Sequence, residues 1–162
     1  MALNAYLTIE GEKTGAVAGS VTQKGREKSI MVIGASHEIK SPRDHASGLP
    51  TGKRQHGGLN IIKEVDKSSP LLYNILVNNE NIKKWKLQFW RPSPSGTEFQ
   101  NYTIELENAN IAGIKLVMPN NKHPELMKFA EYEEIQFTYQ KITWTWMDGG
   151  ITAMDDWESP VV

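Results

Sequence analysis

A chain of 162 residues with 18 basic and 19 acidic side chains fits one domain, and its near-zero net charge gives no general attraction to nucleic acid or anionic membranes. It contains no cysteine, which excludes a disulfide framework and a thiolate zinc site. A domain of this length buries roughly two thirds of its unfolded surface and is expected to fold without such supports.

The N-terminus has neither the basic start nor the continuous apolar core of a secretory signal. No stretch approaches the roughly 18 consecutive apolar residues of a membrane span. We therefore expect the chain to be made and folded in the cytoplasm, without membrane insertion.

Alternating apolar residues predict two strands in the first forty residues. Residues 3–9 form the first, and residues 11–28 form a loop with one short strand at most. The second strand is predicted over residues 30–40. One of its faces carries Ser36 and Glu38 and becomes small and polar towards its end. Such a face suits a wall that borders a wet space.

Residues 41–58 form the least core-like segment, with two prolines, four glycines and one large apolar residue, Leu49. A loop of this length is uncommon in a compact domain, so it is expected to be disordered or held by something outside the domain. It is locally basic, because Arg43, His45, Lys53 and Arg54 outnumber the single acid Asp44. A solvated loop is the simplest interpretation.

A strand is predicted over residues 59–65, followed by the only convincing helix, at about residues 66–79. Ser69 is placed as the N-cap with Pro70 at the first helical position, and Asn78–Asn79 offer a left-handed stop. A helix this short is unstable alone, so it must dock on the sheet.

Residues 82–91 predict a strand that points Trp85, Leu87 and Phe89 inward. Trp90 breaks this alternation and faces away from the others. It is predicted to be either a residue of a second layer or an anchor at an interface.

Two long strand patterns, at residues 97–118 and 135–149, change their apolar face part-way. The first change lies near Asn108 and the second near Gln140 and Lys141. Either a β-bulge restores the register or the strand passes from one packing partner to another. Either way the strand turns a corner, as where a sheet of a mainly β fold curls into a small barrel or spans two layers. A last short strand is predicted over residues 151–157.

The sequence contains no convincing catalytic or cofactor motif. The four histidines lack metal-ligand spacing, and residues 48–54 fail the phosphate-loop pattern in glycine spacing and in the final hydroxyl residue. The acid pairs Glu133–Glu134 and Asp155–Asp156 point to opposite faces of their strands, so they are expected to be solvated edge charges. We therefore predict no enzyme, no metal and no cofactor.

The tryptophans leave a second interpretation open, a small-ligand or carbohydrate-binding β-barrel. Aromatic residues in strands are core residues by default, and we favour that interpretation. A third alternative, an RNA-binding barrel that uses Arg43, Lys53 and Arg54, predicts salt-sensitive binding.

Several short motifs stand out along the chain: Glu64–Pro70 before the helix, Tyr139–Trp144 with Asp148–Gly149 after it, and Asp156–Trp157 near the end. Together they resemble the haemolysin-coregulated protein (Hcp) family of the bacterial type VI secretion system. The resemblance runs over essentially the whole chain. It implies a two-sheet, barrel-like fold of one domain, residues 1–162, in a structural protein without chemistry of its own.

The resemblance also implies partners and sites. Six copies form a ring, and rings stack into a hollow tube. Its partners are sheath and spike proteins of the secretion apparatus. The protein leaves the cell through that apparatus without a signal peptide. The tube carries or chaperones effector proteins in its lumen, which Ser36, and with it Glu38, is expected to line. The loop at residues 41–58 is expected to reach neighbouring subunits or rings. The residues predicted at an interface are Arg43, Asp44, His45, Leu49, Lys53 and Arg54 of this loop, together with Trp90.

Overall fold

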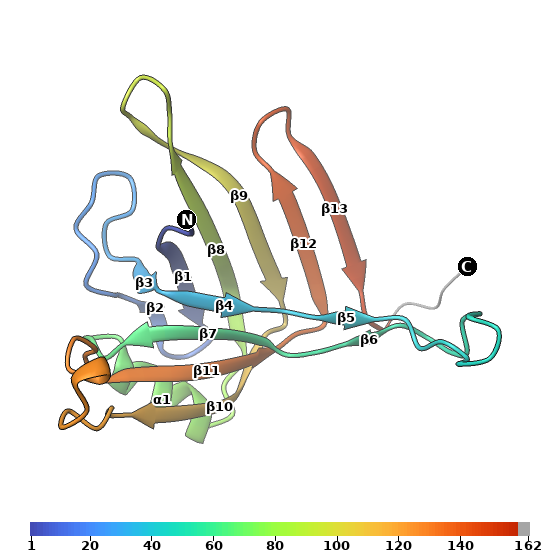
Figure 1. Cartoon of the computed structure of the whole chain (residues 1–162), viewed down its shortest axis with the longest axis horizontal. Helices are drawn as coiled ribbons and strands as arrows, with labels where there is room; N and C mark the ends of the chain where they lie inside the picture. The colour runs from blue at the N-terminus through green and yellow to red at the C-terminus, as the bar shows by residue number, and fades with distance from the viewer. Residues whose placement is uncertain (159–162) are drawn as a thin grey trace.

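The computed structural model describes residues 1–158 and confirms a mainly β fold with one short α-helix (Figure 1). The elements, in chain order, are β1 (Ala5–Gly11), β2 (Gly15–Val17), β3 (Ile30–Val32), β4 (Gly34–Ser36), β5 (Ile39–Lys40), β6 (Gln55–His56), β7 (Leu59–Glu64), α1 (Ser69–Val77), β8 (Ile82–Pro92), β9 (Glu98–Glu107), β10 (Asn110–Val117), the 3₁₀ turn η1 (Pro124–Leu126), β11 (Tyr132–Thr138), β12 (Lys141–Trp146) and β13 (Ile151–Asp156).

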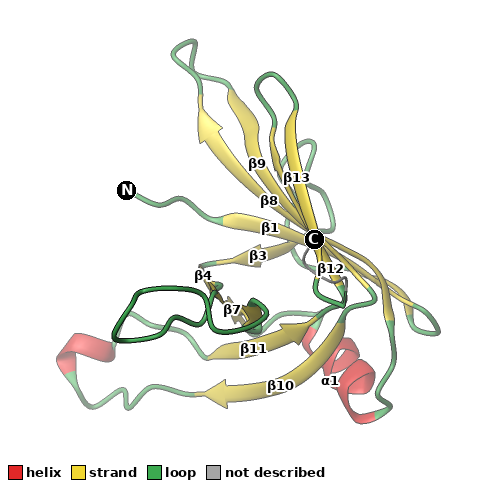
Figure 2. Cartoon of the chain, turned by 90° about the vertical axis from the view of Figure 1, so that its right-hand side faces the viewer, coloured by secondary structure: helices red, strands yellow, loops and turns green. Residues whose placement is uncertain are grey.

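Two antiparallel sheets enclose the core. The larger has the order β13-β12-β9-β8-β1-β2, with β3 also paired to β1, and the smaller has the order β10-β11-β7-β4. Figure 2 shows them as two layers that diverge from one side. Trp85 from the larger sheet meets Phe137 from the smaller one edge to face, with ring centroids 5.3 Å apart and both side chains at most 1% exposed. The layers are therefore held by interlocking aromatic and aliphatic side chains.

Both predicted changes of face are places where the chain passes from one sheet to the other. After β9 in the larger sheet, Asn108 adopts a positive φ of 51° and leads into β10 of the smaller sheet. After β11 in the smaller sheet, Tyr139 and Gln140 lead into β12 of the larger one. The two crossings meet, because the Asn108 amide donates to Gln140 Oε1 at 2.7 Å. The passage between packing partners, rather than a bulge, explains both patterns.

The predicted strand over residues 30–40 is wrong as one element. It divides at Ile33, where the chain leaves β1 and joins β7, so the core-facing side chains change from one face to the other. The helix also begins differently, because Ser68 is the N-cap and Pro70 stands one position later than predicted. Asn79 takes the left-handed conformation expected at the helix end, with φ of 49°.

A buried ion pair joins α1 to the smaller sheet, contrary to the expectation that Glu133 is a solvated edge charge. Lys63 Nζ lies 2.8 Å from Glu133 Oε1, and neither side chain is more than 1% exposed. Ser69 Oγ donates to the same carboxylate oxygen at 2.7 Å and accepts from Lys63 Nζ at 3.0 Å. Asp66 Oδ1 completes the cluster, 3.2 Å from Lys63 Nζ. We call these four residues the clasp.

Candidate functional site

The basic loop is an ordered projection, which we call the arm and define as residues 38–57. It is drawn in teal on the right of Figure 1, and it points towards the viewer in Figure 2. Its base is the two-stranded sheet β5–β6, and Gly57 N donates to Glu38 O at 2.8 Å. The base of the loop is therefore structured by contacts within its own chain, and contact of the loop with a partner stays a prediction.

A network of side chains fixes the base of the arm to the larger sheet. Arg54 donates from Nε and Nη2 to the two carboxylate oxygens of Asp155 in β13, at 2.6 and 2.9 Å, and from Nη2 to Asp156 O at 2.7 Å. Such paired contacts fix geometry as well as contributing free energy. The guanidinium lowers the pKa of the Asp155 carboxyl, so the charged form is favoured. Asp155 is consequently an anchor rather than a solvated edge charge.

Two histidines extend this network through Tyr139, at the crossing between β11 and β12. The Tyr139 hydroxyl lies 2.6 Å from His37 Nε2 and 2.7 Å from His56 Nδ1, and His56 Nε2 lies 2.7 Å from Asp155 Oδ2. The His56 side chain is fully buried. We call Arg54, Asp155, His56, Tyr139 and His37 the clamp.

The clamp has one consistent proton order when both histidines are neutral. The Asp155 carboxylate only accepts, so His56 Nε2 carries a hydrogen and Nδ1 accepts from the Tyr139 hydroxyl. Tyr139 then accepts from His37 Nε2. Burial together with the Asp155 charge raises the pKa of Tyr139, which keeps its hydroxyl protonated.

Acidification is expected to weaken the clamp. Burial, and then the neighbouring His56, lower the pKa of His37 below its usual 6.5, so folding favours the neutral form and stability falls as pH drops below that value. The lowered pKa of Asp155 has the same effect at lower pH, because stability falls further as the pH drops below the usual carboxyl value of 3.8. The thermal midpoint should fall by a few degrees between about pH 7.5 and about pH 5.5.

Scanning calorimetry on two variants tests this expectation. His37→Gln keeps a donor for Tyr139 but cannot titrate, so it should lose much of the pH dependence. His45→Gln, on the exposed part of the arm, should behave like the parent chain. Equal pH dependence in all three proteins would rule out His37 as a source of it.

Trp157 covers the clamp from the end of β13. Its ring stacks on His56 with centroids 5.5 Å apart and meets Tyr139 edge to face at 6.0 Å. The other tryptophans divide: Trp85 is buried, Trp144 packs against the core and Trp146 is 45% exposed. The core interpretation therefore holds for Trp85 and Trp144 but not for Trp146.

The outer face of the smaller sheet is a polar surface. Ser36 pairs with Asn60, Asn60 with Gln136, and Gln136 with Gly113, so one row of small or amide side chains crosses all four strands. The three side chains of this row are exposed. Glu38 lies just beyond, exposed, and pairs loosely with Lys40 at 3.4 Å. The wet face predicted for Ser36 is thus the outer face of this sheet.

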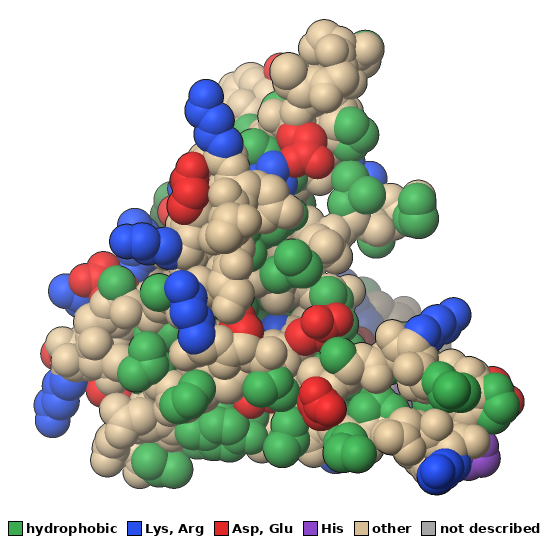
Figure 3. Space-filling view, turned by 90° about the vertical axis from the view of Figure 1, so that its left-hand side faces the viewer, with side chains coloured by type: hydrophobic (Ala, Val, Ile, Leu, Met, Phe, Trp, Pro, Cys, Tyr) green, Lys and Arg blue, Asp and Glu red, His purple; other side chains and the backbone are tan. Residues whose placement is uncertain are grey.

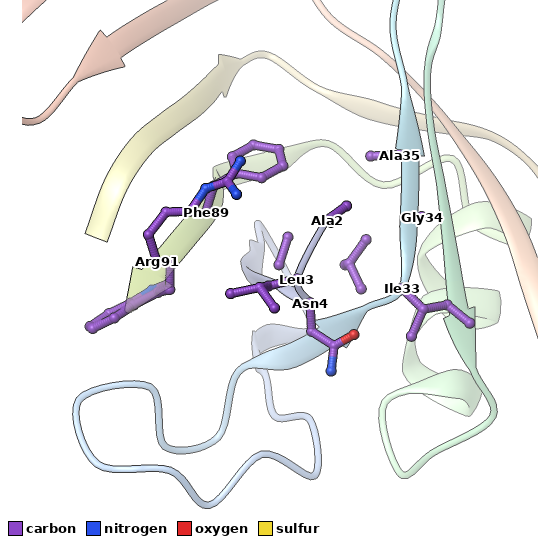
Figure 4. Close-up of a pocket in the computed structure, with 11 residues that line it drawn as sticks. Ala2, Leu3, Asn4, Ile33, Gly34, Ala35, Phe89 and Arg91 are labelled. Carbon is purple, nitrogen blue, oxygen red and sulfur yellow. The ribbon is translucent and has the colours of Figure 1, made fainter. Parts of the chain in front are cut away.

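Trp90 lies apart from the arm and is half-buried. The Arg26 guanidinium stacks over its ring, 4.3 Å from the centroid, and also over Tyr6 at 4.6 Å. Trp90 also lines a groove between the N-terminal residues, the β3–β4 junction and the end of β8, part of which Figure 4 shows. The exposed side chains of Leu3 and Ile33 make this groove apolar.

The structure brings together most of the predicted site residues. Five lie on the outer part of the arm: Arg43, Asp44, His45, Leu49 and Lys53. Arg54 is at the arm base, bonded within its own chain, while Ser36 and Trp90 lie elsewhere. Sequence reasoning missed the clamp, since Arg54 and Asp155 are 101 positions apart and no spacing connects them. The only hint in the sequence was that two of the motifs contain Tyr139, which belongs to the clamp, and Trp157, which covers it.

Among residues 1–158, no group of three histidine or acidic side chains is arranged to hold a metal ion. In the same described part, no helix is long and apolar enough to cross a membrane.

Comparison with known proteins gives these surfaces a context. The model of the family described as "Type VI secretion system effector, Hcp" matches residues 6–146. The chain belongs to the Hcp family. The "Major exported protein" of Pseudomonas aeruginosa is 42% identical over 170 aligned residues, covering 99% of both chains.

Solved structures agree. A crystal structure titled "Hcp protein" has a TM-score of 0.89 and 30% identity, covering 97% of this chain and 99% of its own. "Secreted protein Hcp3" from Pseudomonas aeruginosa has a TM-score of 0.78 and 34% identity, covering 96% of this chain and 99% of its own. As a member of the Hcp family, the chain is a structural, non-enzymatic tube or secreted protein of the type VI secretion system.

Proposed function

We propose that six copies of the chain form a ring, and that rings stack into a hollow tube that carries or chaperones effector proteins. Sheath and spike proteins of the type VI apparatus are its further partners. The tube is assembled in the bacterial cytoplasm and leaves the cell through the apparatus. The observation that most supports this proposal is the four-stranded sheet, which ends in two free edges, β4 and β10.

Free strand edges carry unpaired backbone donors and acceptors that a second chain can satisfy. Because β4 and β10 are opposite edges of one sheet, joining the edge of one copy to the opposite edge of the next is a heterologous contact. Contacts of this kind give a ring when the rotation between successive copies closes, and an open filament when it does not. The apolar groove at Leu3, Ile33 and Trp90 lies beside β4 and is proposed to add area to the same contact.

Ring closure through these edges gives the outer face of the smaller sheet a role. If that face turns inward, the row of Ser36, Asn60 and Gln136 lines the lumen, with Glu38 near its rim. Small and amide side chains offer hydrogen bonds without strong charge, which suits the passage of varied proteins. The arm, which extends along the strands of the same sheet, would then project from the ring towards a neighbour.

Electron microscopy and light scattering of the purified protein test the ring. We expect annular particles with about six times the 18.2 kDa mass of one chain. Ser36→Gln should still form rings, because the side chain is exposed, but should retain less effector in co-purification. Only a monomer at micromolar concentration would contradict the ring, and unchanged effector retention by Ser36→Gln would contradict the lumen assignment.

A further inference from the structure

The arm and a second apolar site lie at opposite ends of the molecule. The outer part of the arm occupies one end of the longest axis (Figure 1), and the junction of α1 with the ends of β7 and β10 occupies the other. Figure 3 looks onto this other end and shows hydrophobic side chains gathered along its lower part, with acidic ones among them. A projection and a receptive surface are thus placed for contact between successive copies.

The receptive surface contains a shallow pocket lined mainly by carbon. Val65, Pro70, Tyr73 and Leu116 form its apolar walls, and Glu131 stands at its margin. The side chains of Val65 and Leu116 are 48% and 58% exposed, which is unusual for large aliphatic residues at the junction of a helix and a sheet. Below them the clasp fixes α1 to the sheet, so the walls are rigid. We call this pocket the socket.

The tip of the arm presents one large apolar side chain on an ordered turn. Leu49 is 65% exposed. The turn beneath it is held by Asp44, whose carboxylate accepts from Ser47 N at 2.8 Å and Ser47 Oγ at 2.7 Å, and whose backbone N donates to Leu49 O at 2.9 Å. A bridge between Arg43 and Pro50 closes the turn. An apolar group on a preorganised turn loses little entropy when it is bound.

Charge favours the same pairing. The arm carries Arg43 and Lys53 on exposed positions, whereas the socket has Glu131 at its margin and Glu64 at the end of the adjoining strand. Both acids are exposed and the structure gives neither an ion pair among residues 1–158. Opposite charges around an apolar centre orient an approaching partner more than they strengthen its binding.

We propose that Leu49 and Pro50 at the arm tip of one copy occupy the socket of a copy in the next ring. This inference rests on the proposed ring, and it names the surface of the neighbouring copy that the arm contacts. Burial of one leucine is too small a contact to hold two free subunits together. A ring offers the contact once per subunit, and the combined contacts make stacking strong where single contacts are weak. Stacking therefore follows ring formation.

Cysteine cross-linking tests the inference, because the parent chain has no cysteine. A disulfide forms only when two Cα atoms approach to within about 7 Å, and the tip and the socket of one chain lie at opposite ends. Oxidation of a Leu49→Cys, Leu116→Cys double variant at a concentration that gives tubes should produce a ladder of covalent species extending beyond six chains. A Leu49→Cys, Val77→Cys variant, with the second cysteine exposed on α1 outside the socket, should give at least about tenfold less.

The remaining outcomes separate this inference from the proposed function. Rings that stack without the ladder, or with a ladder that stops at six chains, would overturn the socket while leaving the ring in place. A stop at six would indicate contacts within one ring rather than between rings. Absence of annular particles from the parent protein by electron microscopy would overturn the proposed ring and the socket together.

Discussion

Replacing Glu133 with alanine is expected to lower the free energy of unfolding by about 3–5 kcal/mol, since it leaves the Lys63 ammonium buried without its main partner. The Ser69 hydroxyl also loses its acceptor. Denaturant titration followed by tryptophan fluorescence measures the change. Glu134→Ala is the matched control, because its exposed side chain points to the opposite face of β11, and it should change stability by less than about 0.5 kcal/mol.

The interpretation of the clasp can be checked with a second variant. Replacing both charges, as in Lys63→Met with Glu133→Leu, removes the fully buried pair and leaves Asp66, which is partly exposed and keeps its hydrogen bonds to Ser68. This double variant should recover most of the stability that Glu133→Ala loses. If Glu133→Ala and Glu134→Ala were equally stable, the buried pair would have no structural role of the kind described.

Replacing Asp155 with alanine is expected to release the arm while the two-sheet core stays folded. The change removes the carboxylate that accepts from both Arg54 and His56, so the attachment of the arm base to β13 is weakened to the bond between Arg54 and the Asp156 carbonyl. Trypsin cleavage after Arg43 or Lys53 should become at least about tenfold faster, which corresponds to about 1.4 kcal/mol less free energy for local opening. Limited proteolysis followed by mass spectrometry measures it.

The control for this variant is Asp148→Ala, in the exposed turn between β12 and β13. It should leave the cleavage rate of the arm unchanged. Because a free arm no longer holds Leu49 in a fixed position, Asp155→Ala should also form rings that stack poorly. Cleavage and stacking like those of the parent would show that the clamp does not position the arm.

The clamp and the clasp also account for landmarks that carried the family resemblance. Asp66 and Ser69, within Glu64–Pro70, belong to the clasp. Tyr139 belongs to the clamp, and Trp157 covers it. These residues thus hold the frame on which the arm and the polar face are carried, while Val65 and Pro70 of the first motif line the socket.

The sequence by itself indicated most of the strands and a mainly β fold. A residue alternation with period two reports which side chains face a core, but the changes of phase at Asn108 and Gln140 fitted either a β-bulge or a change of packing partner, and the tertiary structure decided between them. The family could be inferred in the same way, since its landmarks are local. The prediction from alternation failed at Ile33, where one strand was expected and two are found. Each of these strands has three residues, which is too few to distinguish a change of phase from a single strand with two apolar faces.

Only the tertiary structure decided which charged residues are buried and what the loop does. Glu133 and Glu134 are neighbours with identical chemistry, and their different roles depend on Lys63, which is 70 positions away. The arm has the composition of a solvated loop, and its structure comes from β5–β6 pairing at its base and from contacts of that base with the distant residues Asp155 and Tyr139. Contacts between distant positions decide these features, and no local pattern records them because the free energy of a charge depends on its partners and burial.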